Sequence, residues 1–331
     1  MLNDKTILVT GGTGSFGKQF VKTVLQKYSP KKLIIFSRDE LKQFEMSQHF
    51  SEEQYPCIRY FIGDIRDKER LIRAFKGVDY VIHAAALKHI PICEYNPFEA
   101  IKTNVIGVMN IIDAALETGV KRVIALSTDK ACSPVNLYGA TKLCLEKLFT
   151  QANSYSGETG TRFSCVRYGN VIASRGSVIP FFLQERKKGV IPITDERMTR
   201  FWMTLDQAVE LVLTSLARMY GGETFIPKIS SMRVVDLAKA VAPECSLKII
   251  GTRPSEKLHE LLISIDENNR ASDLGDCYAL FPEFSWWASE KYQDIKKVED
   301  GFSYSSLNNT QWLSVDDLRR LVNQLENKHE F

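Results

Sequence analysis

The segment TGGTGSFG, Thr10 to Gly17, most constrains what this chain can fold into. It follows the apolar β-branched run TILVT directly and opens a stretch with helical periodicity, FGKQFVKTVLQKY. Glycines at positions 11, 14 and 17 permit a tight turn, a close approach of backbone to a pyrophosphate, and close helix–sheet packing. Backbone N–H groups at the helix N-terminus would then meet the phosphate charge. The segment therefore predicts a dinucleotide-binding turn between a strand and a helix.

Short apolar runs alternate with helix-period stretches over the first half of the chain. We expect strands at 6–10, 32–37, 58–63, 79–85, 122–127 and 162–168, and helices that include 16–28 and 98–119. Nearly continuous apolar strands separated by helices are typical of a parallel sheet covered on both faces. The predicted fold is α/β: a Rossmann-type doubly wound parallel sheet with a smaller, partly discontinuous α/β substrate domain. We expect the nucleotide-binding domain at 1–168, with return segments at about 202–226, and the substrate domain mainly at 169–331.

Composition excludes several classes of partner. With 44% hydrophobic residues, 25% charged residues and a net charge of +3, the chain has the composition of an ordinary globular protein. The basic doublets are scattered, so nucleic acid is not an expected partner. No apolar run approaches membrane-spanning length and no leader precedes the first strand, so we expect no membrane association and a cytoplasmic location. The spacing of the seven cysteines matches no metal site, and no metal is expected.

The end of the second expected strand, IIFSRDELK, lies where a dinucleotide's ribose is usually bound. Ser37, Arg38 and Lys42 are suited to a 2′-phosphate, whereas Asp39 and Glu40 favour a free hydroxyl. These residues favour NADP over NAD. After the third strand, Asp64 is placed to bind the adenine amino group and Ile65 to pack on its ring.

The segment LSTDKACSPVNLYGATK, Leu126 to Lys142, carries a Tyr-x-x-x-Lys pair. Tyr138 is a candidate base at a substrate hydroxyl, and we expect the charge of Lys142, together with an oxidised nicotinamide, to lower its pKa. Thr128, or Ser127, is expected to hydrogen-bond the same substrate oxygen. Asp129 and Lys130 have no role in a plain dehydrogenase.

TGGTGSFG, GDIRD, AAALKH and YGATK together resemble the extended short-chain dehydrogenase/reductase family, over nearly the whole chain. STDKACSPVNLYGATK, RYGNVIASRGSVIPFF, PITDERMTRFWM and GTRPSEKLHE are similar to segments of the inverting UDP-N-acetylglucosamine 4,6-dehydratases. The resemblance implies NADP, UDP-N-acetylglucosamine as substrate, and a homo-oligomer, hexameric in better-known members. It also implies the first step of pseudaminic acid biosynthesis for flagellin glycosylation.

The implied reaction oxidises carbon 4, eliminates water across carbons 5 and 6, and returns the hydride to carbon 6. Its product is UDP-2-acetamido-2,6-dideoxy-β-L-arabino-hexos-4-ulose. Retaining relatives carry Asp-Glu where this chain has Asp129-Lys130, and the exchange goes with inversion at carbon 5. A basic Lys130 needs a lowered pKa and an acidic Asp129 a raised one. Which of Asp129, Lys130 and Tyr138 moves which proton stays open, and the alternative is a structural ion pair between Asp129 and Lys130.

The resemblance also implies the site residues. Those expected around the cofactor are Gly11, Thr13, Gly14, Ser15, Phe16, Gly17, Ser37, Arg38, Asp39, Glu40, Leu41, Lys42, Asp64, Ile65, Ala84, Lys88, Tyr138, Lys142 and Val171. Those expected around the substrate are Lys88, Ser127, Thr128, Asn170, Arg175, Thr194, Arg200, Arg253 and Glu256. The expected catalytic residues are Thr128, Asp129, Lys130, Tyr138 and Lys142.

Two alternatives remain from the sequence. A UDP-sugar 4-epimerase uses the same oxidation at carbon 4 but needs no acid–base pair beside Thr128. A non-catalytic nucleotide-sensing protein of this fold would commonly lack the Tyr-x-x-x-Lys pair. The helices expected at 98–119 and from 138 onward carry apolar residues beyond one face, which favours paired helices across a subunit interface.

Overall fold

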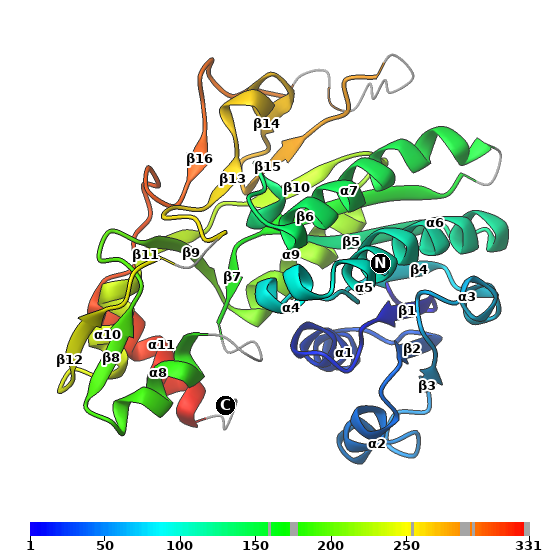
Figure 1. The fold of residues 1–331 in the computed structure, drawn as a ribbon. Coiled ribbons are helices and arrows are strands. Elements are labelled where there is room, and N and C mark those ends of the chain that lie inside the picture. Colours follow the sequence, from blue (N-terminus) through cyan, green and yellow to red (C-terminus); the bar gives the residue numbers. More distant parts are fainter. Residues whose placement is uncertain (158–159, 173–177, 253–254, 285–291, 293–294, 328–331) are drawn as a thin grey trace.

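The structure, a computed structural model, describes residues 1–157, 160–172, 178–252, 255–284, 292 and 295–327. Its central feature is a nine-stranded sheet of order β14-β15-β10-β6-β5-β4-β1-β2-β3 (Figure 1). The strands are β1 Thr6–Thr10, β2 Lys32–Ser37, β3 Ile58–Ile62, β4 Tyr80–His83, β5 Arg122–Thr128, β6 Arg162–Tyr168, β10 Thr224–Pro227, β14 Ala271–Asp273 and β15 Cys277–Leu280. The strands from β3 to β10 pair in parallel, whereas β15 and β14 are antiparallel. The predicted doubly wound parallel sheet is confirmed.

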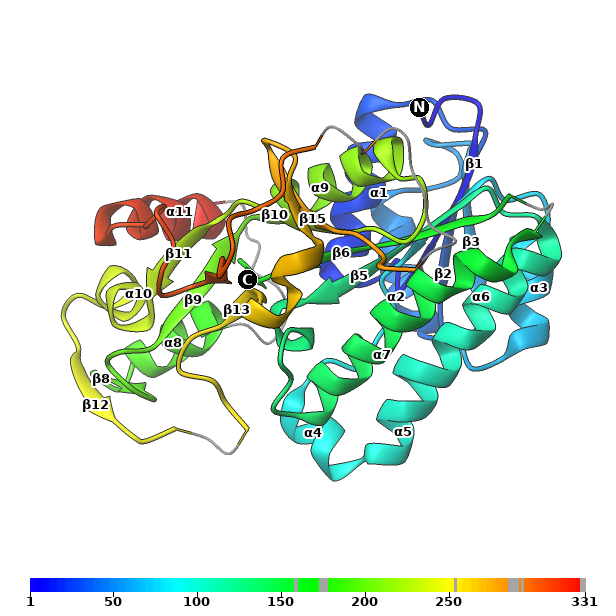
Figure 2. The same ribbon diagram turned by 90° about the horizontal axis from the view of Figure 1, so that it is seen from above.

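Helices cover both faces of this sheet, as Figure 2 shows. One face carries α1 Ser15–Lys27, α2 Glu40–His49 and α9 Leu205–Arg218; the other carries α3 Lys68–Phe75, α6 Gly107–Thr118 and α7 Leu137–Ala152. The inner strands are apolar throughout because both of their faces are buried: β1, for example, has no exposed residue. In the described residues, no helix is both long and apolar enough to cross a membrane.

The helix expected at 98–119 is present, but it contains a π-helical turn and is preceded by a further short helix. The structure has α4 Ile90–Tyr95, α5 Pro97–Ile101, a π-helical turn η1 Lys102–Ile106, and then α6. Asn104 in that turn is buried, and its side chain accepts from the Leu87 backbone N–H and donates to the Leu87 carbonyl, both at 2.8 Å. The widened turn therefore ties the helix to the loop that follows β4.

A second, smaller core lies beside the carboxyl end of the sheet. Its elements are β7 Asn170–Val171, α8 Val178–Arg186, β8 Val190–Ile193, β9 Thr199–Met203, β11 Ser230–Arg233, α10 Val234–Val241, β12 Ser246–Ile249 and α11 Val315–Asn327. Between β9 and β11 the chain returns to the large sheet as α9 and β10. The remaining elements are η2 Asp129–Ala131, η3 Asn153–Tyr155, β13 Leu261–Ile263, η5 Ile265–Arg270 and β16 Tyr304–Ser305. The predicted division at residue 168 stays a prediction, because β14 and β15 also bring the C-terminal part of the chain back to the sheet.

Candidate active site

The glycine turn after β1 packs closely against neighbouring backbone. Gly11 has φ +66°, and a Cβ there would lie 2.8 Å from the Ala85 backbone nitrogen. A Cβ on Gly17 would lie 2.4 Å from the Gly12 carbonyl oxygen. Gly14 caps α1 without a side-chain hydrogen bond. The N-terminus of α1 thus begins directly after the glycine turn, a position that suits a dinucleotide pyrophosphate.

Side chains on either side of this turn support it. The buried Thr13 hydroxyl lies 2.9 Å from the Ser37 hydroxyl, which joins the turn to the end of β2. Ser15 and Phe16 begin α1, and the Phe16 ring stacks near Phe20 at a centroid distance of 6.0 Å. The predicted residues of the turn thus lie together between the end of β1 and the start of α1.

The charges at the end of β2 largely compensate one another. Asp39 caps α2 by accepting from the Lys42 backbone N–H at 3.0 Å, and it also pairs with the Lys42 ammonium. Arg38 is half-exposed, with Nη1 3.6 Å from Oδ2 of Asp64. Glu40 and Leu41 are exposed beside it. Of the two predicted cations, Arg38 is therefore the better placed for a phosphate, since Lys42 already has a close carboxylate.

The adenine-side residues follow β3 and β4. Asp64 accepts from Arg66 through both backbone N–H and guanidinium; burial would raise the pKa of Asp64, but the Arg66 hydrogen bonds outweigh it and lower the pKa. Ile65 is buried against α6, where a Cβ on Gly107 would lie 2.9 Å from its Cδ1. Ala84 donates its backbone N–H to Thr10. Val171 follows Asn170 at the end of β7 and packs against the hydrophobic core of the large sheet.

The predicted catalytic pair lies on α7 against the end of β5. Tyr138 and Lys142 are both buried. The Lys142 ammonium donates to the Leu126 carbonyl at 2.8 Å, and burial lowers the pKa of Lys142 to about 8. Asn136, the N-cap of α7, accepts from the Gly139 N–H at 2.8 Å and so fixes the helix start that presents Tyr138.

The pKa of Tyr138 differs from the expectation. Burial raises it to about 12, Asp129 adds to the rise, and Lys130 and a Thr128 hydrogen bond oppose it. The prediction combines the charge of Lys142 with that of an oxidised nicotinamide. Within the protein itself, burial outweighs the opposing Lys130 charge and Thr128 hydrogen bond. Ionisation of this phenol therefore needs a further positive charge beside it.

Thr128 and Ser127 point to different neighbours, because successive side chains alternate along β5. The Thr128 hydroxyl donates to Asp129 Oδ1 at 3.0 Å. The Ser127 hydroxyl donates to Glu146 Oε1 at 2.6 Å, away from that group. The geometry favours Thr128 over Ser127 as the residue beside Tyr138.

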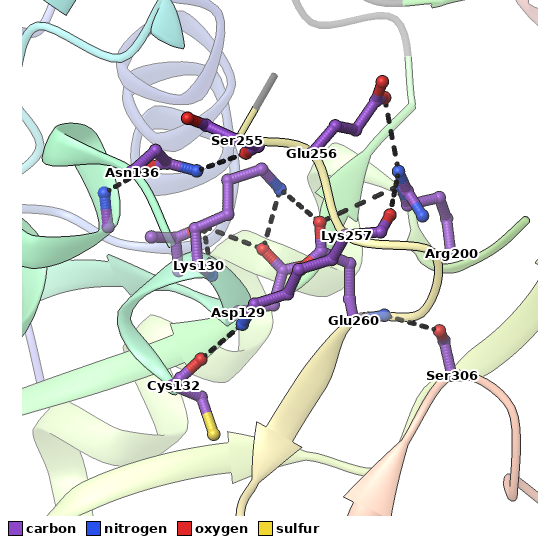
Figure 3. Close-up of polar contacts among 12 residues, drawn as sticks. Asp129, Lys130, Cys132, Asn136, Arg200, Ser255, Glu256, Lys257, Glu260 and Ser306 are labelled. Carbon is purple, nitrogen blue, oxygen red and sulfur yellow. Dashed lines mark hydrogen bonds and ion pairs between the residues drawn. The ribbon is translucent and has the colours of Figure 1, made fainter. Parts of the chain in front are cut away.

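Asp129 and Lys130 form an ion pair, and Glu260 lies close to the same ammonium group (Figure 3). Lys130 Nζ lies 3.0 Å from Asp129 Oδ1 and 3.4 Å from Glu260 Oε1. Burial would lower the pKa of Lys130, but the two carboxyl groups outweigh it and raise the pKa. Burial, reinforced by Glu260, raises the pKa of Asp129. The raised pKa of Asp129 meets the requirement for a proton donor; the lowered pKa that a basic Lys130 needs is not present.

The predicted substrate residues lie on the side of the smaller core. Arg200 on β9 is buried, and its Nη2 lies 3.4 Å from Glu256 Oε1 and donates to the Lys257 carbonyl at 3.0 Å. Asn170 on β7 has a buried Oδ1 without a hydrogen-bond partner among the described residues. Thr194 follows β8 and is partly exposed.

Three further predictions have other outcomes. Arg175 and Arg253 lie outside the described residues. Lys88 lies in the loop after β4, where partial desolvation and the charge of Lys130 lower its pKa. That coupling brings Lys88 to the Asp129–Lys130 side of the site.

Sequence reasoning missed three groups that build the site. Glu260 stands in the quoted segment GTRPSEKLHE, but only Glu256 was selected there, and nothing in the sequence connects position 260 to position 130. Asn104 gave one signal, a polar residue within an apolar helical stretch. Arg167, fully buried on β6, binds Glu146 of α7 and Glu267 of η5, and its signal is a charge within an expected inner strand, between Val166 and Tyr168.

Comparison with known proteins agrees with this geometry. A family model described as polysaccharide biosynthesis protein matches residues 7–282. A Campylobacter jejuni protein named UDP-N-acetylglucosamine 4,6-dehydratase (inverting) is 55% identical, over 98% of this chain and 99% of its own. A Rickettsia conorii protein named UDP-glucose 4-epimerase is 41% identical, over 98% of this chain and 97% of its own. The solved structure of Pen from Bacillus thuringiensis has a TM-score of 0.88 at 40% identity, covering 98% and 99% of the two chains.

Proposed function

This chain belongs to the polysaccharide biosynthesis protein family, and from that premise we propose that it is a UDP-N-acetylglucosamine 4,6-dehydratase that inverts carbon 5. The observation that carries the proposal is the ion pair of buried Asp129 with partly exposed Lys130, beside Thr128 and Tyr138. The Campylobacter relative, which bears that name, supports it at 55% identity.

The chemistry assigns each group a task. A bound nicotinamide supplies reversible hydride acceptance, used at carbon 4 and then at carbon 6. Tyr138 handles the proton of the carbon 4 hydroxyl, and Thr128 hydrogen-bonds that oxygen as charge develops on it. The ketone at carbon 4 acidifies the carbon 5 hydrogen; Asp129, Lys130 and Tyr138 are the candidates for the base that takes this proton and the acid that protonates the departing oxygen. The product is UDP-2-acetamido-2,6-dideoxy-β-L-arabino-hexos-4-ulose.

NADP is the cofactor we assign. The uncapped N-terminus of α1 suits its pyrophosphate, and Arg38 and Ser37 at the end of β2 suit a 2′-phosphate. For the sugar nucleotide, Arg200 suits the diphosphate and Glu256 the uridine ribose, with Asn170 and Thr194 beside them. The class of reaction is that of a lyase.

Assembly and context form part of the proposal. Exposed apolar side chains gather on α4, α5, η1 and α6: Ile92, Tyr95, Phe98, Ile101, Ile106 and Met109. An apolar surface of this kind suits a second copy of the chain, and a hexamer fits the family resemblance. The proposed reaction is the first step of pseudaminic acid biosynthesis for flagellin glycosylation, and we place it in the cytoplasm.

Incubation of the purified protein with UDP-N-acetylglucosamine alone tests the activity. We expect a 4-keto, 6-deoxy product that absorbs in base, formed without added reductant. The Rickettsia relative favours one competitor, a UDP-sugar 4-epimerase. That enzyme would instead yield the carbon 4 epimer and no 6-deoxy sugar, and this result would overturn the proposal.

A further inference from the structure

Glu260 is a third carboxyl group in the acid–base cluster. It directly precedes β13, and its backbone is held on both sides by Ser306: the Glu260 N–H donates to Ser306 Oγ at 2.9 Å, and the Ser306 N–H donates to the Glu260 carbonyl at 2.8 Å. Figure 3 shows the side chain directed from this anchor toward Lys130 and Arg200. Glu260 is 3% exposed, so its carboxyl group depends on protein partners alone.

The cluster holds fewer close donors than two carboxylates need. Lys130 is shared, 3.0 Å from Asp129 and 3.4 Å from Glu260. Asp129 Oδ2 and Glu260 Oε2 are both buried, and neither has a hydrogen-bond partner among the described residues. Two carboxyl groups close to the same ammonium group in a largely buried cluster rarely stay ionised together unless one of them has further cations, because each charge raises the cost of the other.

The charged neighbours decide which carboxyl group keeps its charge. Glu260 faces three cations, which lower its pKa although burial alone would raise it: Lys130, Arg200 and Lys257. Burial raises the pKa of Asp129; the neighbouring Lys130 cation opposes the rise, and the Glu260 anion adds to it. The remaining titratable groups around the pair are Tyr138 on α7 and Lys88 after β4, both of which interact with Lys130.

The hydrogen bonds agree with this division. Asp129 Oδ1 accepts from Lys130 and from the Thr128 hydroxyl, each at 3.0 Å. Oδ2 is thus the oxygen that can carry a proton without losing a donor. A proton there gives the cluster a neutral acid directly beside Thr128.

We propose that Glu260 is a positioning residue of the acid–base group: as the anionic partner of Lys130, it lets Asp129 hold a proton on Oδ2 while Lys130 stays an ammonium. The inference rests on the proposed function for its consequence, which is that Asp129 is the acid available to the departing oxygen. The protonation states of Asp129, Lys130 and Glu260, however, belong to the protein itself and can be observed without substrate.

Infrared difference spectroscopy at neutral pH tests the protonation states directly. We expect wild-type protein to show a carboxylic acid C=O stretch that disappears in Asp129→Asn. Glu260→Gln should also remove it, because Asp129 becomes the sole anionic partner of Lys130, and Glu260→Asp should restore it. Glu267→Gln, the same change at a partly buried glutamate that pairs with Arg167 instead, should leave the band in place. A band that persists in Glu260→Gln, or a wild-type protein without one, would overturn the proposal.

Kinetics provide the second readout, and a calorimetric melting transition establishes that each variant is folded. We expect Glu260→Gln to lower kcat by roughly 10- to 100-fold with KM little changed. Removing the Glu260 charge lowers the pKa of Asp129, so the basic limb of the kcat profile should move to lower pH. A role in folding alone would lower activity without moving that limb. If Glu260→Gln does not fold, two other measurements test the proposal. The carboxylic acid band of the wild type should disappear as the pH is raised, and Glu260→Asp should show the band at neutral pH. If the protein is no dehydratase, the infrared result still stands or falls by itself.

Discussion

Arg167 holds Glu146 through two hydrogen bonds, Nη2 to Oε2 at 2.6 Å and Nε to Oε1 at 2.9 Å, with both side chains buried. The same guanidinium binds Glu267 through Nη1 and Nη2 at 2.7 and 2.8 Å. Glu146 in turn accepts from Ser127, the residue before Thr128. The end of β5, which carries the acid–base pair, therefore rests on an ion cluster that joins β6, α7 and η5.

Replacing Arg167 by Met should destabilise the fold by about 3–5 kcal/mol, because two buried carboxylates lose their shared cation. Chemical denaturation measures this loss. Arg319→Met is the control: its ion pair with Asp316 is exposed, so its unfolding free energy should stay near that of the wild type. Equal stability of the two variants would show that the buried cluster does not support the fold.

Glu267 predicts how stability depends on acid. Burial opposes its charge, but Arg167 and Arg270 outweigh burial and lower the pKa of Glu267 to about 2. A carboxyl group with a depressed pKa stabilises the fold above its unfolded value and loses that contribution as pH falls toward the folded value. The contribution is about 3 kcal/mol, present above about pH 4.5 and lost toward pH 2. We expect the stability gap between wild type and Glu267→Gln to narrow on acidification; a gap that is constant with pH would contradict this.

The sequence predicted the parallel strands well because strands buried on both faces are apolar throughout, and a short window shows this. It did not predict β10, β14 and β15, since segments of 3 and 4 residues are too short to show a period. The π-helical turn at Asn104 was not predicted either, because apolar periodicity does not report a side chain that binds a distant loop.

The site shows the same division. Residues in one local segment, such as Thr128, Asp129, Tyr138 and Lys142, were identified together because helical and strand spacing relate them directly. Glu260 joins this group only through the path of the chain across the smaller core. Its effect on Asp129 is a matter of burial and three-dimensional charge, neither of which spacing reveals.

Gly11→Ala should weaken nucleotide binding beyond any loss of stability. A Cβ at this position meets the Ala85 backbone at 2.8 Å, and the residue has φ +66°. Gly77→Ala is a matched control, with φ +72° and nothing within 4 Å of the added atom. Both variants should lose about 1 kcal/mol from backbone strain, but only Gly11→Ala should lose nucleotide affinity. Titration with NADP alongside thermal unfolding separates the two effects, and unchanged affinity in Gly11→Ala would contradict the assigned turn.

The apolar surface on α4 to α6 predicts self-association. Phe98 is 77% exposed and Tyr95 is 88% exposed, which is unusual for large aromatic side chains. Light scattering should show an oligomer for the wild type, and the double change Tyr95→Glu, Phe98→Glu should reduce its mass. Leu307→Glu, at an exposed apolar residue outside these helices, should not. A wild-type monomer at micromolar concentration would refute the assembly.

Tyr138 and Lys130 should fail at different steps of the proposed reaction. Tyr138→Phe removes the group at the carbon 4 hydroxyl, so single-turnover mixing should produce no absorbance of reduced nicotinamide. Lys130→Met keeps the bulk of the side chain but removes the ammonium that lies between Asp129 and Glu260. Oxidation should then proceed while overall turnover falls by roughly 100-fold, the usual scale for a lost acid–base group. Nucleotide binding should be unchanged in both variants, which separates chemistry from folding.

The configuration of the wild-type product tests inversion. Carbon 5 is planar once the elimination has occurred, so the position of the proton donor decides which face is protonated. NMR of wild-type product made in deuterated water should show deuterium at carbon 5 and the L-arabino configuration. A D-configured product would reject inversion. Full activity of Lys130→Met would reduce the Asp129–Lys130 contact to a structural ion pair, whereas a slow variant that accumulates reduced nicotinamide would assign Lys130 to the steps after oxidation.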